Sequence, residues 1–464
     1  MIDHLTALVD ELDTARIREG AIRLLSEIGM AVPSPEVVRR LQAAGVQIEK
    51  GRAFFRPEAV AAFMDRRRQE AAPEPAEQPL RLEAGSHCLY EFCPEKRRVQ
   101  PLTMASLERW TRLVGALRTR GTLASAFCPG TPSDVPPHLA PLWQQFIGAR
   151  FLADPPIYAY SPAYAPHASA MAEVLGRELS VGVHPISPLV LGGDELALAL
   201  RLLDEGRIKT TGVAPMPVMG VTAPLDWVAA WAQALAEAVG TGLALEAAGM
   251  ERVWVLAALY VADLRSGTFV FGSAEHALIT LAEAKVNREL LGSARRGAKA
   301  IDTTAKEPGP QAAIEKTAHT LAALLGGYRS LNCVASLAID EIFSPEQLFI
   351  DLDIVAHCER IARGVEGRFG EGDVVALVQE GVDAQQYLTA EATLDRFRAF
   401  HQASATFDRR STGSWLADPR TELDRARDLA QEAIDGYQYE LDQNRQRALK
   451  EIIARADAAL RLGG

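Results

Sequence analysis

Two patterns of apolar and polar residues alternate through the middle of the chain. Short apolar runs predict strands, which span residues 123–127, 157–160, 186–191, 210–214, 253–260, 298–303 and 331–336. Longer segments with apolar residues at helical spacing lie between them, at 104–117, 139–152, 168–179, 194–203, 226–248, 274–291, 311–325 and 345–361. Strands that alternate with helices in this way predict a parallel sheet.

The expected fold class is therefore α/β. The number of units favours a (β/α)8 TIM-type barrel over a doubly wound sheet. Only seven strands stand out from the pattern. We expect the eighth within 364–381 or within 80–100, a segment that otherwise predicts a β-hairpin with its turn near Glu95.

Helical patterns flank this region on both sides, so the expected fold is a barrel with helical extensions. We place a helical N-terminal region at 1–79, which ends in a Pro/Glu/Ala linker, the barrel at 80–381, and C-terminal helices packed on the barrel at 382–464. One long helix is predicted at 421–460. It packs on the barrel or on a neighbouring subunit, so a homo-oligomer is one expectation.

The segment 209–248 carries the clearest local signal. A short strand runs into a loop rich in proline and glycine, 215–224, and a helix of more than twenty residues follows Asp226. Proline fixes φ and glycine reaches angles that other residues avoid, so such a loop holds one shape. Loops at the carboxyl ends of parallel strands carry the ligand sites of α/β folds, and this loop is therefore a candidate site.

Composition and charge narrow the classes of function. A hydrophobic content of 48% with 23% charged residues is typical of a folded globular protein. The net charge of −11 argues against general binding to nucleic acid or to an anionic membrane. Helix 227–248 is apolar but contains Glu237 and Glu246, which argues against a membrane span.

The N-terminus lacks the pattern of a signal peptide, and the five scattered cysteines suit reduced thiols, so we expect a cytoplasmic protein. The common signatures of hydrolases, metalloproteases and nucleotide-binding loops are missing from the sequence. Its nine histidines form no cluster with metal-ligand spacing, and we predict no metal site.

What remains are polar and aromatic residues near predicted strand ends. Tyr160 and Tyr260 each end a strand, and aromatic rings there attract cations through their π faces. The alternative is that both rings fill core volume. Asp302 follows an apolar strand, where a carboxylate faces the site end of a barrel. Glu237 lies within an alanine-rich helix, either as a site residue or as the acceptor of a buried hydrogen bond from a neighbouring loop.

Several segments, in their order along the chain, resemble the MttB family of trimethylamine and quaternary-amine methyltransferases. The similar segments are 21–32, 34–36, 41–45, 215–217, 220–224, Ala236-Glu237, 272–275, Gln311-Ala312 with Glu315-Lys316, 344–348 with Ile350-Asp351, and 407–409 with Trp415. The sequence holds only standard residues, and so looks like the branch of the family without pyrrolysine.

This resemblance implies a barrel that passes a methyl group from a small quaternary or tertiary amine, betaine-like in this branch, to the Co(I) of a corrinoid protein. The corrinoid (cobalamin) then belongs to the partner, and no cofactor binds tightly to this chain. On this reading Asp302 and Glu237 are the polar catalytic residues. Tyr160, Tyr260, Thr222 and Gln311 are the substrate-binding residues.

The chemistry agrees with the missing motifs. A quaternary ammonium leaves as a neutral amine without needing a proton, so the protein has only to hold the cation, exclude water and aim one methyl group. The chain departs from its relatives at 383–393, where their histidines are absent, and at 305–310, which contains proline and glycine. Both changes are expected near the barrel mouth.

Two alternatives stay open. One, which the missing histidines motivate, is an amine-binding barrel that has lost methyl transfer. The other is a barrel enzyme with unrelated chemistry, such as a lyase or a hydrolase.

Overall fold

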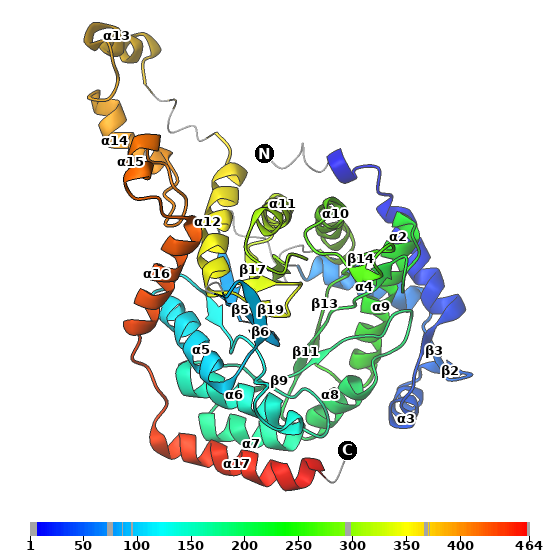
Figure 1. The fold of residues 1–464 in the computed structure, drawn as a ribbon. Coiled ribbons are helices and arrows are strands. Elements are labelled where there is room, and N and C mark those ends of the chain that lie inside the picture. Colours follow the sequence, from blue (N-terminus) through cyan, green and yellow to red (C-terminus); the bar gives the residue numbers. More distant parts are fainter. Residues whose placement is uncertain are drawn as a thin grey trace.

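The computed structural model describes residues 7–71, 78–85, 87–93, 96–292, 298–365, 370 and 372–461. Most of the predicted linker 73–79, and Glu95 of the predicted turn, lie outside these residues. The fold is mixed α/β with parallel strand pairs, as predicted. The helices of the central part lie outside and the strands inside (Figure 1).

Strand–helix units follow one another along the central part of the chain. They are β4 (Arg81–Ala84) with α5 (Met104–Thr119), β7 (Ser125–Ala126) with α6 (Ala140–Phe151), β8 (Ile157–Tyr158) with α7 (Ala165–Leu175), β10 (Gly182–Val183) with α8 (Asp194–Asp204), β11 (Thr210–Val213) with α9 (Trp227–Ala247), β13 (Arg252–Val255) with α10 (Ala274–Leu291), β16 (Lys299–Ala300) with α11 (Pro310–Gly326), and β17 (Ser330–Val334) with α12 (Pro345–Ala362). All the predicted central helices are present, α10 with the bounds predicted.

The parallel strands pair in separate short sheets. The largest has the order β16-β17-β4-β7, and a second has the order β10-β11-β13. β8 pairs with β9 (Leu179–Ser180), and β12 (Val218–Met219) pairs with β14 (Tyr260–Asp263). Among the described residues these sheets are not joined by hydrogen bonds into one closed barrel.

β4 is the strand that the sequence pattern left uncounted. It lies between β17 and β7, with Ala84 opposite Val334 on one side and Ala126 on the other. The predicted hairpin is present but shorter, between β5 (Tyr90–Cys93) and β6 (Arg98–Pro101). β5 also pairs with β19 (Ile342–Phe343), which pairs in turn with β18 (Ser336–Leu337).

Two strand predictions need correction. Residues 186–191 form a tight turn, in which Ile186 and Val190 bond to each other, because Pro188 has no N–H for a ladder. The strand of that unit, β10, lies earlier. The predicted strand 253–260 breaks into β13 and β14, since Asn287 of α10 bonds both the N–H and the carbonyl of Ala257, at 2.9 and 2.8 Å.

The N-terminal region packs on the outer side of the central helices. It contains η1 (Ala7–Val9), α2 (Thr14–Arg23), η2 (Leu24–Ile28), β1 (Met30–Ala31), α3 (Pro35–Ala43), β2 (Gln47–Glu49), β3 (Arg52–Phe54) and α4 (Pro57–Gln69). Ser34 caps α3 as the sequence suggests. Arg40 reaches Asp204 at 2.7 Å, and Arg67 bonds Glu246 of α9, so charged contacts tie the region to the body.

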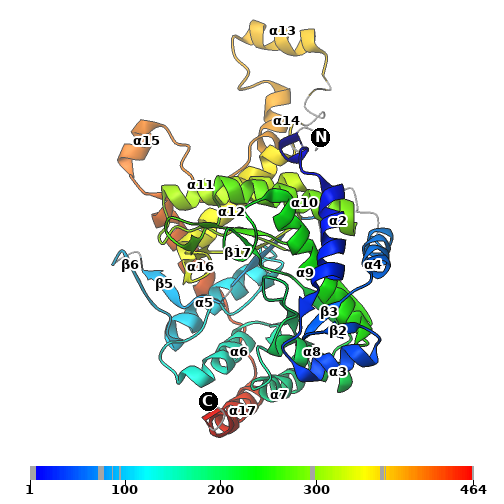
Figure 2. The ribbon, with the colours of Figure 1, turned by 90° about the vertical axis from the view of Figure 1, so that its right-hand side faces the viewer.

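The C-terminal helices are α13 (Val374–Ala384), α14 (Glu391–Phe400), α15 (Thr412–Ala417), α16 (Glu422–Asp435) and α17 (Gln443–Arg461). The single helix predicted at 421–460 is therefore two helices, and Gly436 caps the first of them. α16 packs on α12 and α5, while α17 packs on α7 and α6. α13 and α14 project from the body in both views (Figures 1 and 2), so segment 383–393 does not lie at the ends of the parallel strands, contrary to expectation.

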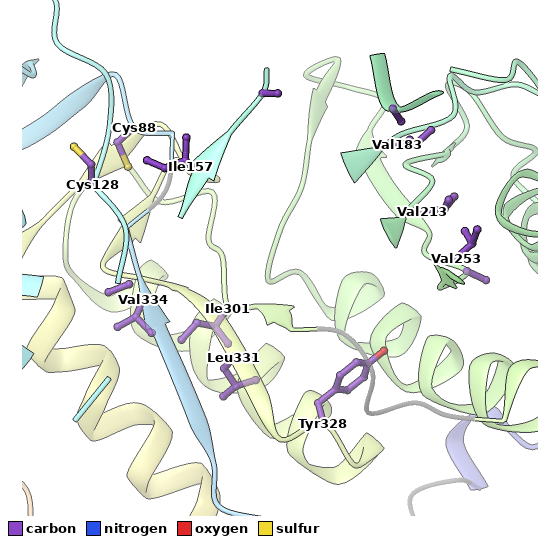
Figure 3. Packing of buried hydrophobic residues seen from close by; sticks show 14 of the residues in the cluster. Cys88, Cys128, Ile157, Val183, Val213, Val253, Ile301, Tyr328, Leu331 and Val334 are labelled. Carbon is purple, nitrogen blue, oxygen red and sulfur yellow. The ribbon is translucent and has the colours of Figure 1, made fainter. Parts of the chain in front are cut away.

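A continuous apolar core lies between the strands and the helices. Val183 and Val213 stand opposite each other in the parallel register, with Val253 on the next strand (Figure 3). α9 is long and apolar enough to cross a membrane, but 83% of its most apolar window is buried inside the molecule. That burial is what the core helix of a folded domain requires.

Candidate functional site

A cavity of about 280 Å³ opens at the carboxyl ends of four parallel strands, β4, β7, β8 and β17. Its lining is aromatic and polar: Glu83, Gly85, His87, Phe127, Cys128, Gln144, Gln145, Gly148, Pro155, Pro156, Tyr158, Tyr160, Asn332, Cys333 and Asp340. The parallel register of the sheet brings these strand ends to one edge, since Val334, Ala84 and Ala126 are direct neighbours. The position matches the usual site of a parallel α/β fold.

Four rings in series form one wall of the cavity. Tyr158 lies between Phe127, at 6.2 Å between ring centroids, and Tyr160, at 6.0 Å. Tyr160 meets the ring of His87 edge-on at 6.1 Å. Tyr160 is thus where the sequence placed it, at a strand end and in a cavity, and its neighbours make a surface suited to a small cation.

Two carboxylates face the same cavity, Glu83 of β4 and Asp340. The hydroxyl of Ser125, on the neighbouring strand, donates a hydrogen bond to the Glu83 carboxylate. Burial raises the pKa of Glu83 above its ordinary value, although the Ser125 hydrogen bond and the charge of Arg81 oppose this. Burial also raises the pKa of Tyr158 to about 12, and the charge of Glu83 adds to that shift.

Asp302 follows β16 and is buried behind Cys333, a lining residue. Burial raises the pKa of Asp302 to about 8; the charge of Lys316 opposes the shift and that of Asp340 adds to it. Its Oδ1 atom has no hydrogen-bond partner. Lys316 itself lies 2.8 Å from Asp351, and both side chains are fully buried. Asp302 is not among the residues that line the cavity, and its catalytic role stays a prediction.

Tyr260 belongs to a second aromatic group, apart from Tyr160. At the start of β14 its ring lies 5.6 Å from Phe271 and 6.1 Å from His276. The ring centroids of His276 and His319 are 4.2 Å apart, and burial lowers the pKa of both imidazoles. Burial raises the pKa of Tyr260, with further contributions from the charges of Glu283 and Asp302. Tyr260 is not among the residues that line the cavity, and its role in substrate binding stays a prediction.

Glu237 and Thr222 hold two loops together. Thr222 Oγ1 accepts a 2.9 Å hydrogen bond from the Val218 N–H, which closes the turn of the Pro/Gly-rich loop. Gln233 donates to the Thr222 carbonyl at 2.8 Å and to Glu237 at 2.9 Å.

Glu237 also accepts hydrogen bonds from Ser187 Oγ at 2.6 Å and from the Leu189 N–H at 3.0 Å. These are the buried hydrogen bonds from a neighbouring loop that the sequence analysis gave as the alternative to a site role. Burial raises the pKa of Glu237, and these donors oppose the shift. Glu237 is not among the residues that line the cavity, and its catalytic role stays a prediction.

Gln311 supports the loop that follows Asp302. It donates to Glu315 Oε1 at 2.9 Å. Glu315 Oε2 accepts from Thr303 Oγ1 at 2.5 Å and from the Thr304 N–H at 2.8 Å. Gln311 thus acts through Glu315 on the backbone next to Asp302, and it is not among the residues that line the cavity.

Sequence reasoning missed most of the cavity wall, namely Glu83, Phe127, Gln145 and Asp340. Glu83 was assigned to a hairpin, although the alternation of apolar and charged residues from Leu80 to Ala84, just before Gly85, was a usable signal of a strand. Asp340 follows a strand by several residues, and only the fold brings it to the cavity. Phe127 was predicted to end a strand, without a role.

Comparison with known proteins identifies the family. The family described as trimethylamine methyltransferase (MTTB) matches residues 179–461, more than half of the chain. The chain belongs to the trimethylamine methyltransferase family. The strand ends of β10 to β17 and the C-terminal helices fall inside the matched segment.

Curated members of the trimethylamine methyltransferase family match at modest identity. Trimethylamine methyltransferase MttB of Methanosarcina thermophila is 30% identical over 185 residues, 40% of this chain and 37% of that protein. MttB2 of Methanosarcina mazei is 27% identical over 284 residues, 60% of this chain and 56% of that protein. The matches thus span about half, or less, of the length of these relatives.

Proposed function

We propose that this protein transfers a methyl group from a small quaternary or tertiary amine to the Co(I) of a separate corrinoid protein. The observation that carries the proposal is the cavity wall: three aromatic rings, Phe127, Tyr158 and Tyr160, stand beside the carboxylates of Glu83 and Asp340. Aromatic faces and carboxylates attract a methylated ammonium group. Family membership supports the reaction type.

The residues of the chain bind and orient the amine. The rings remove water from the ammonium methyl groups, and the carboxylates balance the positive charge. The nitrogen of a quaternary ammonium, or of a tertiary amine bound in its protonated form, keeps both electrons of the broken C–N bond and leaves as a neutral amine. The methyl carbon forms its new bond with the electron pair of Co(I), which the partner supplies. Exclusion of water and fixed aim are the contributions that geometry can make.

The size of the cavity bears on where the corrinoid lies. About 280 Å³ is near the lower end of ligand pockets in proteins, roughly 300–1,000 Å³, and suits a small amine. A corrinoid macrocycle does not fit that volume. The residues present therefore suit the methyl donor, and the acceptor approaches the mouth on its own protein.

We further propose that the strands form a (β/α)8 barrel. The described residues contain a strand before each of the eight helices α5 to α12, and the last strand of the series, β17, pairs with the first, β4. Such pairing is what closure requires. An experimental structure with continuous register from β7 through β16 would test this.

The test of function uses the purified chain with reduced cobalamin, and separately with a reduced corrinoid protein, across a panel of methylamines and quaternary amines. Mass spectrometry measures the demethylated amine, and loss of Co(I) absorbance reports the acceptor. We expect one amine to lose a methyl group in step with Co(I). Tyr160→Ala should reduce that turnover at least tenfold, whereas Glu451→Gln, on the exposed face of α17, should not.

Amine binding without demethylation by either acceptor would favour the amine-binding barrel that has lost methyl transfer. Demethylation that survives Tyr160→Ala and Glu83→Gln would place the reaction outside this cavity.

A further inference from the structure

The charges around the cavity discriminate between kinds of amine. Two carboxylates line it, and the lining residues identified in the described part of the chain include no lysine and no arginine. The basic side chain among them is the imidazole of His87, which lies edge-on against Tyr160. A betaine carries a carboxylate beside its ammonium group. In this cavity that carboxylate would meet like charges.

The neutral polar groups of the lining also favour a ligand that donates hydrogen bonds over one that carries a carboxylate. Gln145 donates from Nε2 to the Tyr158 carbonyl at 3.0 Å, which fixes the amide and leaves Oε1 as an acceptor. That Oε1 atom is buried and has no partner, and Asn332 Oδ1 is in the same condition. Both residues line the cavity, where an unpartnered acceptor is satisfied by a water or by a ligand that donates a hydrogen bond.

We propose, on the basis of the function proposed above, that the substrate is an ammonium compound without a carboxylate that bears a hydroxyl or N–H donor. Its class is that of cationic amino alcohols and not of betaines. The methylated nitrogen lies against Phe127, Tyr158 and Tyr160, its charge balanced by Glu83 and Asp340. The hydroxyl donates to a buried amide oxygen, that of Gln145 or Asn332.

Four probes of related shape separate the contributions. Choline has the cation and the hydroxyl, tetramethylammonium has the cation alone, and glycine betaine has the cation with a carboxylate. In 3,3-dimethylbutan-1-ol a carbon replaces the nitrogen, which leaves the hydroxyl without the charge. Isothermal titration calorimetry of the full chain, without any methyl acceptor, gives the four dissociation constants.

We expect choline to bind most tightly, followed by tetramethylammonium, and both to bind on the order of tenfold or more tightly than glycine betaine. The neutral alcohol should bind weakly. Glu83→Gln and Asp340→Asn should each reduce the preference for choline over glycine betaine by several-fold, while Glu451→Gln should leave it unchanged. The affinity of each variant for 3,3-dimethylbutan-1-ol checks that its cavity is intact.

The outcomes separate this inference from the function on which it rests. Glycine betaine bound more tightly than choline would overturn the substrate class. Glycine betaine demethylated in place of choline would overturn the substrate class and uphold methyl transfer. Choline bound preferentially but never demethylated would uphold the recognition and overturn methyl transfer. Equal binding of choline and the neutral alcohol would overturn the role of the carboxylates, and no binding of any probe would overturn both proposals.

Discussion

Glu83 gives the cavity a dependence on pH. Burial raises its pKa, so its charged form is lost as the pH falls through that raised value. A bound cation prefers the charged carboxylate, and we therefore expect the affinity for tetramethylammonium to rise with pH through the acidic range. Calorimetry at a series of pH values measures this. Glu83→Gln should flatten the profile, and a variant profile as steep as the parent would assign the effect to another group.

Asp302 makes the stability of the fold depend on pH: we expect its contribution to the free energy of unfolding to fall as the pH rises. Its pKa is raised to about 8 in the folded protein, so folding takes up a proton in the pH range between its unfolded pKa of about 4 and this raised value. Relative to Asp302→Asn, the parent should lose stability as the pH rises from about 4 to 8 and then level off. Urea unfolding of both proteins across that range measures the difference. A constant difference would mean that Asp302 is charged in the fold.

At the scale of elements, Asp353 of α12 fixes the chain where it returns from the projecting helices. Its carboxylate accepts bonds from Ser404 Oγ at 2.8 Å and from the N–H groups of Ala405 and Thr406 at 3.1 and 2.7 Å. We expect Asp353→Ala to cost about 2–3 kcal/mol and to speed hydrogen exchange at 404–406. Asp395→Ala, exposed on α14, is the matched control. Unchanged exchange at 404–406 would mean that other contacts hold this return.

The elements that the sequence predicted well are those with local signals. α10 was predicted with both ends, because Ser273 caps its start and Gly292 follows its end in the left-handed region. β4 was assigned to a hairpin because its parallel partner β17 lies some 250 residues later in the chain. Periodicity within a segment carries no information about so distant a neighbour.

For the candidate site too, local signals were readable from the sequence and long-range neighbours were not. Tyr160 was found by its place at a strand end, whereas Glu83 and Asp340 depended on which strand ends become neighbours. Glu237 stood out because its helix is rich in alanine, but its partners Ser187 and Leu189 come from a loop that the sequence pattern had assigned to a strand.

At the scale of the whole molecule, α17 closes the body on one side. Its buried face includes Leu449, Ile452 and Ile453, and it packs on α7 and α6. Ending the chain at Asp442 should uncover this apolar surface, lower the melting temperature by several degrees and increase binding of a hydrophobic dye. Differential scanning calorimetry measures the first effect. Leu416→Ala, exposed on α15, should leave both unchanged. An unchanged melting temperature on truncation would mean that α17 contributes little to stability.

Five residues that line the cavity precede residue 179, where the match to the family begins, and they are Glu83, Phe127, Gln145, Tyr158 and Tyr160; Asn332 and Asp340 lie within the match. The segment that shows the family therefore supplies only part of the lining that would contact the ligand. We therefore expect two members that are closely similar across residues 179–461 to differ in substrate where these five positions differ. Grouping family members by the residues at these five positions, and not by total identity, should group them by substrate.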